Sequence, residues 1–328
     1  MLRELSIRHD QFPLVAPFRI SRGTRLAADV VTVELRQGQH LGRGESVPYA
    51  RYGESVASVI EEMETFRGLL VAGMGRDELQ VRLPPGAARN ALDAALWDLE
   101  WQQTSVPVWA QLARGPHEAV VSALTISIDT PERMGEAAAR LADAGLIKVK
   151  LDASDAAARL EAVRRAAPRA RLMVDANESW NIGLLRELQA TLEHCGVELI
   201  EQPLPADADD DLLGYSGSIP LCADEACHVS ADLARLRGRY QAVNIKLDKT
   251  GGLTEAWRLL QAARADGFRI MVGCMVGSSL GIAPALEIAR EAEFIDLDGP
   301  LWLQHDYPGG LVLKDGWLQP PAPGFWGA

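Results

Sequence analysis

The chain has 328 residues, of which 48% are hydrophobic and 24% charged, and its formal net charge is −12. This composition is typical of a globular protein with a large core, and the negative charge argues against nucleic acid and anionic membranes as partners. No uninterrupted apolar segment approaches the length of a membrane span. Four cysteines without a CxxC spacing, and an N-terminus without an apolar signal segment, predict a cytoplasmic protein with reduced thiols.

The N-terminal third, residues 1–117, predicts an α+β domain of its own. Alternating apolar residues predict one strand at 2–9 and another at 29–36. The Gly- and Pro-rich stretch 42–55 (GRGESVPYARYGES) predicts a loop, with a turn at its first two glycines. Helical spacing predicts helices at 54–71 and 86–103.

From residue 120 onward, apolar β-branched runs alternate with stretches of helical spacing, such as 131–144 and 254–265. Eight strands that alternate with helices predict an α/β fold, a modified (β/α)8 or TIM-type barrel at 118–303. The tail at 304–328, rich in Gly, Pro and Trp, is expected to pack back on the N-terminal domain and complete it as a cap. The eight predicted strands are 120–128, 146–152, 171–177, 197–203, 220–226, 242–248, 268–274 and 293–298.

Three successive barrel strands each end in a carboxylate, where the chemistry of such barrels is found. Asp175, Glu201 and Asp224 end the third, fourth and fifth strands. A single Asp at a strand end is more often a helix cap or a turn residue, but three converging anions need a cation. Oxygen ligands without His or Cys favour Mg²⁺ over zinc. We therefore predict a magnesium site formed by these three residues.

Three lysines flank the predicted metal site. Side chains alternate along a strand, so Lys148 and Lys150 share one face of the second strand, and Lys246 stands on the sixth. A substrate bound to the metal would have a lysine on each side. A neighbouring ammonium lowers the pKa of a lysine, so we expect Lys148 to make Lys150 a usable base. The metal would stabilise the enediolate that forms when a proton next to a carboxylate is removed.

The ordered motifs of the chain resemble the muconate-lactonizing subgroup of the enolase superfamily, whose sites combine a Lys or His base with Mg²⁺. The resemblance covers essentially the whole chain, including "GRGES" and "AARNALDAALWDLE", which look like the capping domain of that family. It implies one Mg²⁺ per subunit, with Mn²⁺ as a substitute. The motifs are KVK at 148–150, DANESW at 175–180, EQP at 201–203, ADE at 223–225 and NIKLDKTGG at 244–252.

The last barrel strand ends in "DLDGPLWL", which resembles the Asp-x-Asp motif of the dipeptide epimerases in this subgroup. The resemblance implies that Asp296 and Asp298 bind the α-ammonium of a dipeptide. No lysine or arginine occurs in 296–310, so we expect the cation between them to come with the substrate. The other implied contacts are Thr125, the backbone at Cys274 and Val276, and Arg22, in preference to Arg25, for a glutamyl side-chain carboxylate.

These residues predict a Mg-dependent proton transfer between two lysines at a carbon next to a carboxylate. The resemblance implies that this carbon is the glutamyl α-carbon of a small dipeptide, with L-Ala-D-Glu converted to L-Ala-L-Glu. One alternative is a sister enzyme, an N-acylamino acid racemase or o-succinylbenzoate synthase, against which the aspartate pair argues. Another is a barrel that only binds a metal-chelated peptide, which has no use for bases on both faces. Murein peptides are the expected substrate source, and a homo-oligomer is left open.

Overall fold

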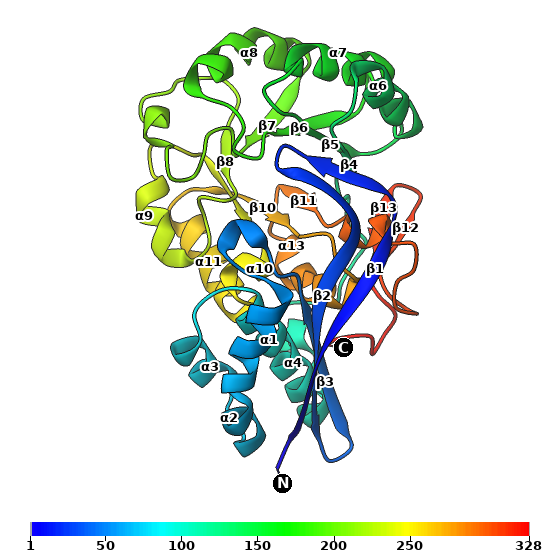
Figure 1. Cartoon of the computed structure of the whole chain (residues 1–328), viewed down its shortest axis with the longest axis vertical. Helices are drawn as coiled ribbons and strands as arrows, with labels where there is room; N and C mark the ends of the chain where they lie inside the picture. Colours follow the sequence, from blue (N-terminus) through cyan, green and yellow to red (C-terminus); the bar gives the residue numbers. More distant parts are fainter. Residues whose placement is uncertain (1, 328) are drawn as a thin grey trace.

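The computed structural model describes residues 2–327 and has an N-terminal α+β domain beside a barrel of parallel strands (Figure 1). Three antiparallel strands form the N-terminal sheet in the order β1-β2-β3, and helices follow them in the chain. Helix α4 packs on β3 and shares a core with the sheet. The elements are β1 (Glu4–Ile20), β2 (Gly23–Gln37), β3 (His40–Ser46), η1 (Ala50–Tyr52), α1 (Val56–Thr65), α2 (Arg67–Ala72), α3 (Arg76–Arg82) and α4 (Ala87–Thr104).

The prediction of a loop and glycine turn at 42–46 is wrong, because these residues belong to β3. Gly42 and Gly44 are in register with β2. A Cβ on either glycine would collide with a backbone carbonyl oxygen of α4, that of Ala95 or Ala91. Glycine is therefore required by the close approach of a helix to the strand, and the chain does not turn there.

All eight predicted barrel strands are confirmed in position, each shorter than expected. Neighbouring strands are parallel and follow chain order around the sheet. The first and last strands are joined by the amide of Ala123, which donates to the carbonyl oxygen of Ile295 at 2.7 Å. The strands are β4 (Leu124–Ile126), β5 (Leu146–Lys150), β6 (Arg171–Asp175), β7 (Val197–Glu201), β8 (Leu221–Ala223), β9 (Ala242–Ile245), β10 (Arg269–Gly273) and β11 (Phe294–Asp296).

Helices form the outer layer of the barrel (Figure 1). The predicted helix at 131–144 begins at Pro131 as expected and ends early, at Arg140. Thr130 caps its start, with a hydroxyl that accepts the amide of Arg133. The predicted helix at 254–265 is confirmed as α11. The helices are α5 (Val108–Gln111), α6 (Pro131–Arg140), α7 (Ala156–Ala166), α8 (Ile182–His194), α9 (Leu233–Leu236), α10 (Leu247–Thr250), α11 (Leu253–Ala265), α12 (Ser279–Ile282) and α13 (Leu286–Ala289).

The barrel interior is divided into an apolar part and a polar part. Outward positions such as Ile147 and Val149 join the large core under the helices. Inward apolar side chains form a separate cluster, and the polar inward positions Lys148 and Lys150 follow it along β5. The cluster therefore fills one end of the barrel and leaves the polar groups at the carboxyl ends of the strands. Its buried members are Ala123, Leu146, Met173, Leu199, Cys222, Ala242, Met271 and Phe294.

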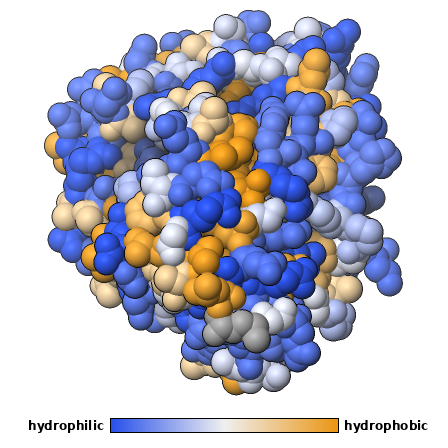
Figure 2. Space-filling model, turned by 60° about the horizontal axis from the view of Figure 1, so that its bottom comes forward, coloured by the Kyte–Doolittle hydropathy of each residue, from blue (hydrophilic) through white to orange (hydrophobic). Residues whose placement is uncertain are grey.

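The C-terminal segment contacts both parts of the molecule. Strands β12 (Val312–Lys314) and β13 (Trp317–Gln319) form a hairpin, and Leu318 forms a bridge with Val120. The indole of Trp326 donates to the carbonyl oxygen of Arg43 at 3.1 Å, in the N-terminal domain. Figure 2 shows a largely hydrophilic face with a band of hydrophobic side chains. Within residues 2–327, no helix has the length and apolar character needed to cross a membrane.

Candidate active site

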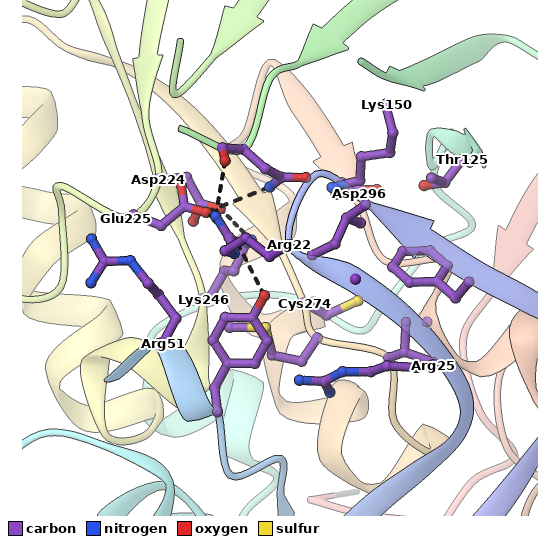
Figure 3. Close-up of a pocket in the computed structure, with 18 of the residues that line it drawn as sticks. Arg22, Arg25, Arg51, Thr125, Lys150, Asp224, Glu225, Lys246, Cys274 and Asp296 are labelled. Carbon is purple, nitrogen blue, oxygen red and sulfur yellow. Dashed lines mark hydrogen bonds and ion pairs between the residues drawn. The ribbon is translucent and has the colours of Figure 1, made fainter. Parts of the chain in front are cut away.

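A cavity of about 440 Å³ lies at the carboxyl ends of the barrel strands, beneath the β1–β2 turn and η1 of the N-terminal domain (Figure 3). Of the predicted site residues, only Asp175 and Glu201 do not line it, and they lie beneath it, in contact with Lys148. The structure therefore brings the whole predicted set together. The lining members are Arg22, Thr125, Lys148, Lys150, Asp224, Lys246, Cys274, Val276, Asp296 and Asp298.

The three predicted metal ligands are adjacent and buried. Asp175 and Glu201 are register partners at the ends of β6 and β7, and Asp224 follows β8 directly. Within residues 2–327, no group of three or more His, Cys, Asp and Glu side chains is placed to hold a metal ion as the side chains stand. Lysine ammoniums lie between the carboxylates instead. Lys148 Nζ is 2.6 Å from Glu201 Oε2 and 3.1 Å from Asp175 Oδ2.

The oxygen atoms of these carboxylates have a pattern that fits a hard cation. One oxygen of each is held by a fixed donor: Asp175 Oδ1 by the amide of Asn177, Glu201 Oε1 by Asn244, and Asp224 Oδ1 by Lys249. The second oxygen of each contacts a lysine ammonium, and Glu201 Oε2 has no hydrogen bond although it is buried. Three carboxylates that each present one oxygen, without His or Cys, suit Mg²⁺.

The buried charges shift one another's pKa values. Burial raises the pKa of Glu201 to about 8, with a further contribution from Asp175. Burial also acts to raise the pKa of Asp175, but Lys150 and Lys148 outweigh it and hold that pKa below its ordinary value. Burial acts to lower the pKa of Lys148, but Asp296, Glu201 and Asp175 raise it well above the ordinary range. Lys148 is therefore a fixed positive charge among three carboxylates.

The two lysines predicted to transfer protons lie on opposite sides of the barrel. Lys150 ends β5 and Lys246 follows β9, four strands away in a barrel of eight. Lys150 Nζ contacts Asp175 Oδ2 at 2.5 Å, and Lys246 Nζ contacts Asp224 Oδ2 at 2.6 Å. Figure 3 shows them at separate places around the cavity. Activation of Lys150 by Lys148 stays a prediction, although both ammoniums contact the same oxygen of Asp175.

The expectation that the aspartate pair lacks a cation of its own is wrong for Asp296. Lys148 on β5 reaches past β4 to it, with Nζ 2.7 Å from Asp296 Oδ2 on β11. Asp298 has no ion pair within residues 2–327, and its Oδ2 accepts the backbone amide of Thr125 at 2.7 Å. Burial and the neighbouring Asp296 raise the pKa of Asp298 to about 6. Asp298 is therefore the member of the pair that is open to a substrate cation.

The predicted arginine is already occupied by the protein. Arg22 donates from Nη1 to the carbonyl oxygen of Asn177 and to Glu178, and from Nη2 to Tyr49 and Glu225. These four contacts use all the terminal N–H groups of the guanidinium. Arg25 lines the same cavity and lies over the ring of Tyr49, with Cζ 4.9 Å from its centre.

The Arg25 side chain makes no hydrogen bond or ion pair within the described part of the chain. The sequence analysis assigned no role to the rest of the cavity wall, most of which comes from the N-terminal domain. Asn177 and Glu225 belong to the DANESW and ADE motifs, and the aromatic residues of "PYARYGES" were the signal for part of the N-terminal wall. These further lining residues are Phe18, Ile20, Thr24, Tyr49, Arg51, Tyr52, Asn177, Glu225 and Met275.

Two family models match the chain. The "Mandelate racemase / muconate lactonizing enzyme, N-terminal domain" matches residues 2–112, and the "Enolase C-terminal domain-like" model matches 133–325. The L-Ala-D/L-Glu epimerase of Escherichia coli (strain K12) is 46% identical over 97% of this chain and 99% of its own. The N-acetyl-D-glutamate racemase of a Pseudoalteromonas species is 45% identical over 91% of this chain and 95% of its own.

Solved structures agree with these matches. A crystal structure of an Agrobacterium tumefaciens enolase family member with homology to dipeptide epimerases contains sodium and L-Ala-L-Glu. It superposes with a TM-score of 0.97 at 46% identity and covers 99% of this chain and 100% of that one. A dipeptide epimerase from Methylococcus capsulatus, complexed with Mg and L-Arg-D-Lys, has a TM-score of 0.90 at 32% identity, with 99% of both chains covered. The chain belongs to the mandelate racemase / muconate lactonizing enzyme family of the enolase superfamily.

Proposed function

We propose that this protein is an isomerase that epimerises the glutamyl α-carbon of a dipeptide, interconverting L-Ala-D-Glu and L-Ala-L-Glu. The observation that carries the proposal is the placement of Lys150 and Lys246 on opposite sides of one cavity, above three buried carboxylates. Near-full-length similarity to an L-Ala-D/L-Glu epimerase supports the same reaction.

Asp175, Glu201 and Asp224 would hold one Mg²⁺ per subunit, with Mn²⁺ as a substitute. The ion, when bound, would stabilise negative charge that develops on the substrate carboxylate. Lys150 and Lys246 then have complementary tasks. One removes the α-proton from its face, and the other returns a proton to the opposite face, which inverts the carbon. Lys148 keeps a positive charge beneath them and holds Asp296, Glu201 and Asp175 together.

The substrate side chain is assigned to Arg25. Arg22 would have to give up contacts to Glu225 and Glu178 before it could bind a substrate carboxylate in a bidentate manner. Arg25 has its guanidinium free of such contacts and stacks on Tyr49, which orients it at the cavity wall. An arginine in this position favours an acidic side chain on the epimerised residue.

A second candidate activity is the racemisation of N-acylated glutamate. Lys148 already neutralises Asp296, so only Asp298 has a charge that a substrate ammonium could pair with. A relative of similar identity is an N-acetyl-D-glutamate racemase. An N-acyl substrate would leave the charge of Asp298 without a partner, which favours the dipeptide.

The deciding experiment compares two substrates on the purified protein with Mg²⁺. Epimerisation of L-Ala-L-Glu is followed by polarimetry or by NMR of the alanyl methyl group, and N-acetyl-L-glutamate is tested under the same conditions. We expect kcat/KM to be higher for the dipeptide. A higher value for N-acetyl-L-glutamate would reverse the order of the two candidates, and turnover of neither would contradict both.

We further propose that the reaction takes place in the cytoplasm, on peptides released from murein, in which D-glutamyl residues follow L-alanine. Support comes from the four cysteines, none of which forms a disulfide.

A further inference from the structure

A loop next to the metal-ligand set holds an unusual backbone conformation. Asn177 and Glu178, between β6 and α8, both have positive φ, 42° and 67°. This region is unfavourable for residues other than glycine and persists where the surroundings enforce it. Here the amide of Asn177 donates to Asp175 Oδ1 at 2.8 Å, and the amide of Glu178 donates to the carbonyl oxygen of Gln202 at 2.9 Å. The loop is therefore fixed to the ends of β6 and β7, and the Glu178 side chain points toward Arg22 and Arg51 of the N-terminal domain.

Three separate segments meet at the Glu178 carboxylate. Arg51, in η1, binds it in a bidentate manner, with two N–H···O distances of 2.7 Å. Arg22, in the β1–β2 turn, binds it at 3.1 Å. The backbone amide of Ala206, in the loop after β7, donates to it at 2.9 Å. The Glu178 side chain is only 8% exposed, because the two partly exposed arginines cover it. Its contacts with them are charge-assisted.

The two arginines come from the parts of the N-terminal domain that cover the cavity. Figure 3 shows Arg22 and Arg51 on the same side of it. Arg51, Tyr52 and Glu225 also line a neighbouring cavity of about 850 Å³, so they form the partition between the two spaces. Glu178 is thus the barrel anchor of this partition and of the turn that precedes Arg25 on β2.

We propose that Glu178 is a positioning residue that fastens the β1–β2 turn and η1 to the barrel over the cavity before any substrate binds. Release of this fastening governs how readily substrate enters and leaves. Arg22 belongs to the fastening, because its guanidinium binds Glu178 and the carbonyl oxygen of Asn177 in the same loop. The effect on turnover rests on the proposed function, whereas the fastening itself does not.

Hydrogen–deuterium exchange of the substrate-free protein tests the fastening directly. In Glu178→Gln, we expect exchange to accelerate about tenfold in peptides covering 18–26 and 48–54. The Arg51→Gln change should accelerate only 48–54, because Arg22 keeps its own contact. Glu198→Gln is the matched control, since Glu198 also binds an arginine, Arg171, through several hydrogen bonds. Both residues of that pair lie near the amino ends of their strands, whereas Glu178 follows the carboxyl end of β6. It should leave both segments unchanged.

Kinetics then separate positioning from a general loss of structure. We expect Glu178→Gln to raise KM for the dipeptide about tenfold with little change in kcat, and Arg51→Gln to add little more in the double variant. Unchanged exchange in both segments of Glu178→Gln would overturn the proposal even if epimerase activity is present. If Glu178→Gln does not fold, unchanged exchange at 48–54 in Arg51→Gln, which alters a half-exposed side chain, would overturn it instead. If the wild-type protein has no epimerase activity but exchange is accelerated in Glu178→Gln, only the proposed function is refuted.

Discussion

The floor and the roof of the cavity are built on different physical principles. The floor consists of the buried lysines and carboxylates on the strand ends. Lys148, Lys150 and Lys246 each have a carboxylate partner there within 3.1 Å. The roof consists of arginines and tyrosines on loops of the N-terminal domain, where side chains are partly exposed and one arginine has no ionic partner within residues 2–327. The floor is fixed by the register of the sheet, and the roof depends on contacts between distant loops.

This difference assigns different tasks to the two regions. Proton transfer needs groups held to a fraction of an ångström, which strand ends provide. Substrate choice needs surfaces that can differ between related proteins without disturbing the barrel, which loops provide. Changes in the floor should therefore lower kcat for every substrate, and changes in the roof should mostly alter KM and selectivity.

The largest expected effect is the loss of either proton-transfer lysine. Lys150→Met and Lys246→Met should each lower the rate of epimerisation by on the order of 10²–10⁴, the range for general acid–base catalysis. Each variant should still exchange the α-proton of one epimer with solvent, through the lysine that remains. NMR of each epimer in D₂O measures both quantities. Ordinary epimerisation by Lys246→Met would mean that one base is enough.

The second floor prediction concerns the carboxylates. Asp224→Asn removes one of three charges in the ligand set, and we expect at least a hundredfold loss of kcat/KM, because metal stabilisation of charge is worth several kcal/mol. Chelation of the wild-type protein should stop turnover, and added Mg²⁺ or Mn²⁺ should restore it. Calorimetric titration with Mg²⁺ should show weaker binding by the variant. Full activity after exhaustive chelation would contradict the metal assignment.

Asp298→Asn tests the boundary between the two regions. We expect kcat/KM for the dipeptide to fall tenfold to a hundredfold, the cost of losing a charge-assisted contact of about 1.5–3 kcal/mol. An N-acetylated substrate has no ammonium and should be affected little or even benefit. Equal losses for both substrates would show that Asp298 is structural, held for its bond to the Thr125 amide.

Substitutions of the two roof arginines Arg25 and Arg22 should have different effects on substrate selectivity. Arg25→Gln should raise KM for L-Ala-L-Glu on the order of tenfold and leave a dipeptide with a neutral second residue almost unaffected, because only the acidic side chain loses a contact. Arg22→Gln should raise KM for both substrates alike, because it loosens the roof. Selective loss in Arg22→Gln would restore the assignment made from the sequence.

The smallest expected effect is a pH dependence of selectivity. The pKa of Asp298 is raised to about 6 by burial and Asp296, so its charge is present above that pH and lost below it. The ratio of kcat/KM for the dipeptide to that for an N-acetylated substrate should therefore fall severalfold as the pH drops from 7 to 5. Asp298→Asn should remove the pH dependence of this ratio. A flat ratio in the wild-type protein would contradict a role for the Asp298 charge in binding.

The sequence predicted the floor well, for a physical reason. Alternation along single strands determines which side chains point inward, so Lys148 and Lys150 could be placed together without a structure. The contact between Lys148 and Asp296 could not be predicted, because it joins residues 148 positions apart where the barrel closes. Gly42 and Gly44 were wrongly assigned to a turn. In a single sequence, a glycine required by the close packing of a helix cannot be distinguished from a glycine required by a turn.

The roof was predicted least well. Its contacts join short loops to one another. Which of Arg22 and Arg25 is left open to a substrate depends on which guanidinium pairs with Glu225 and Glu178. No local periodicity encodes such contacts. The region was marked only by the resemblance that pointed to Arg22 or Arg25 and by the Gly- and Tyr-containing stretch around residue 50.

Isotope incorporation during wild-type turnover tests most directly whether two lysines share the reaction. L-Ala-L-Glu is incubated with the protein and Mg²⁺ in D₂O, and both epimers are examined by NMR and mass spectrometry before equilibrium. With Lys150 and Lys246 on opposite faces, the newly formed L-Ala-D-Glu should carry deuterium at the glutamyl α-carbon from the first turnover, since its proton comes from the lysine that did not abstract one. The remaining L-Ala-L-Glu should keep mostly protium at that stage. Product that retains the original proton would contradict the two-lysine mechanism.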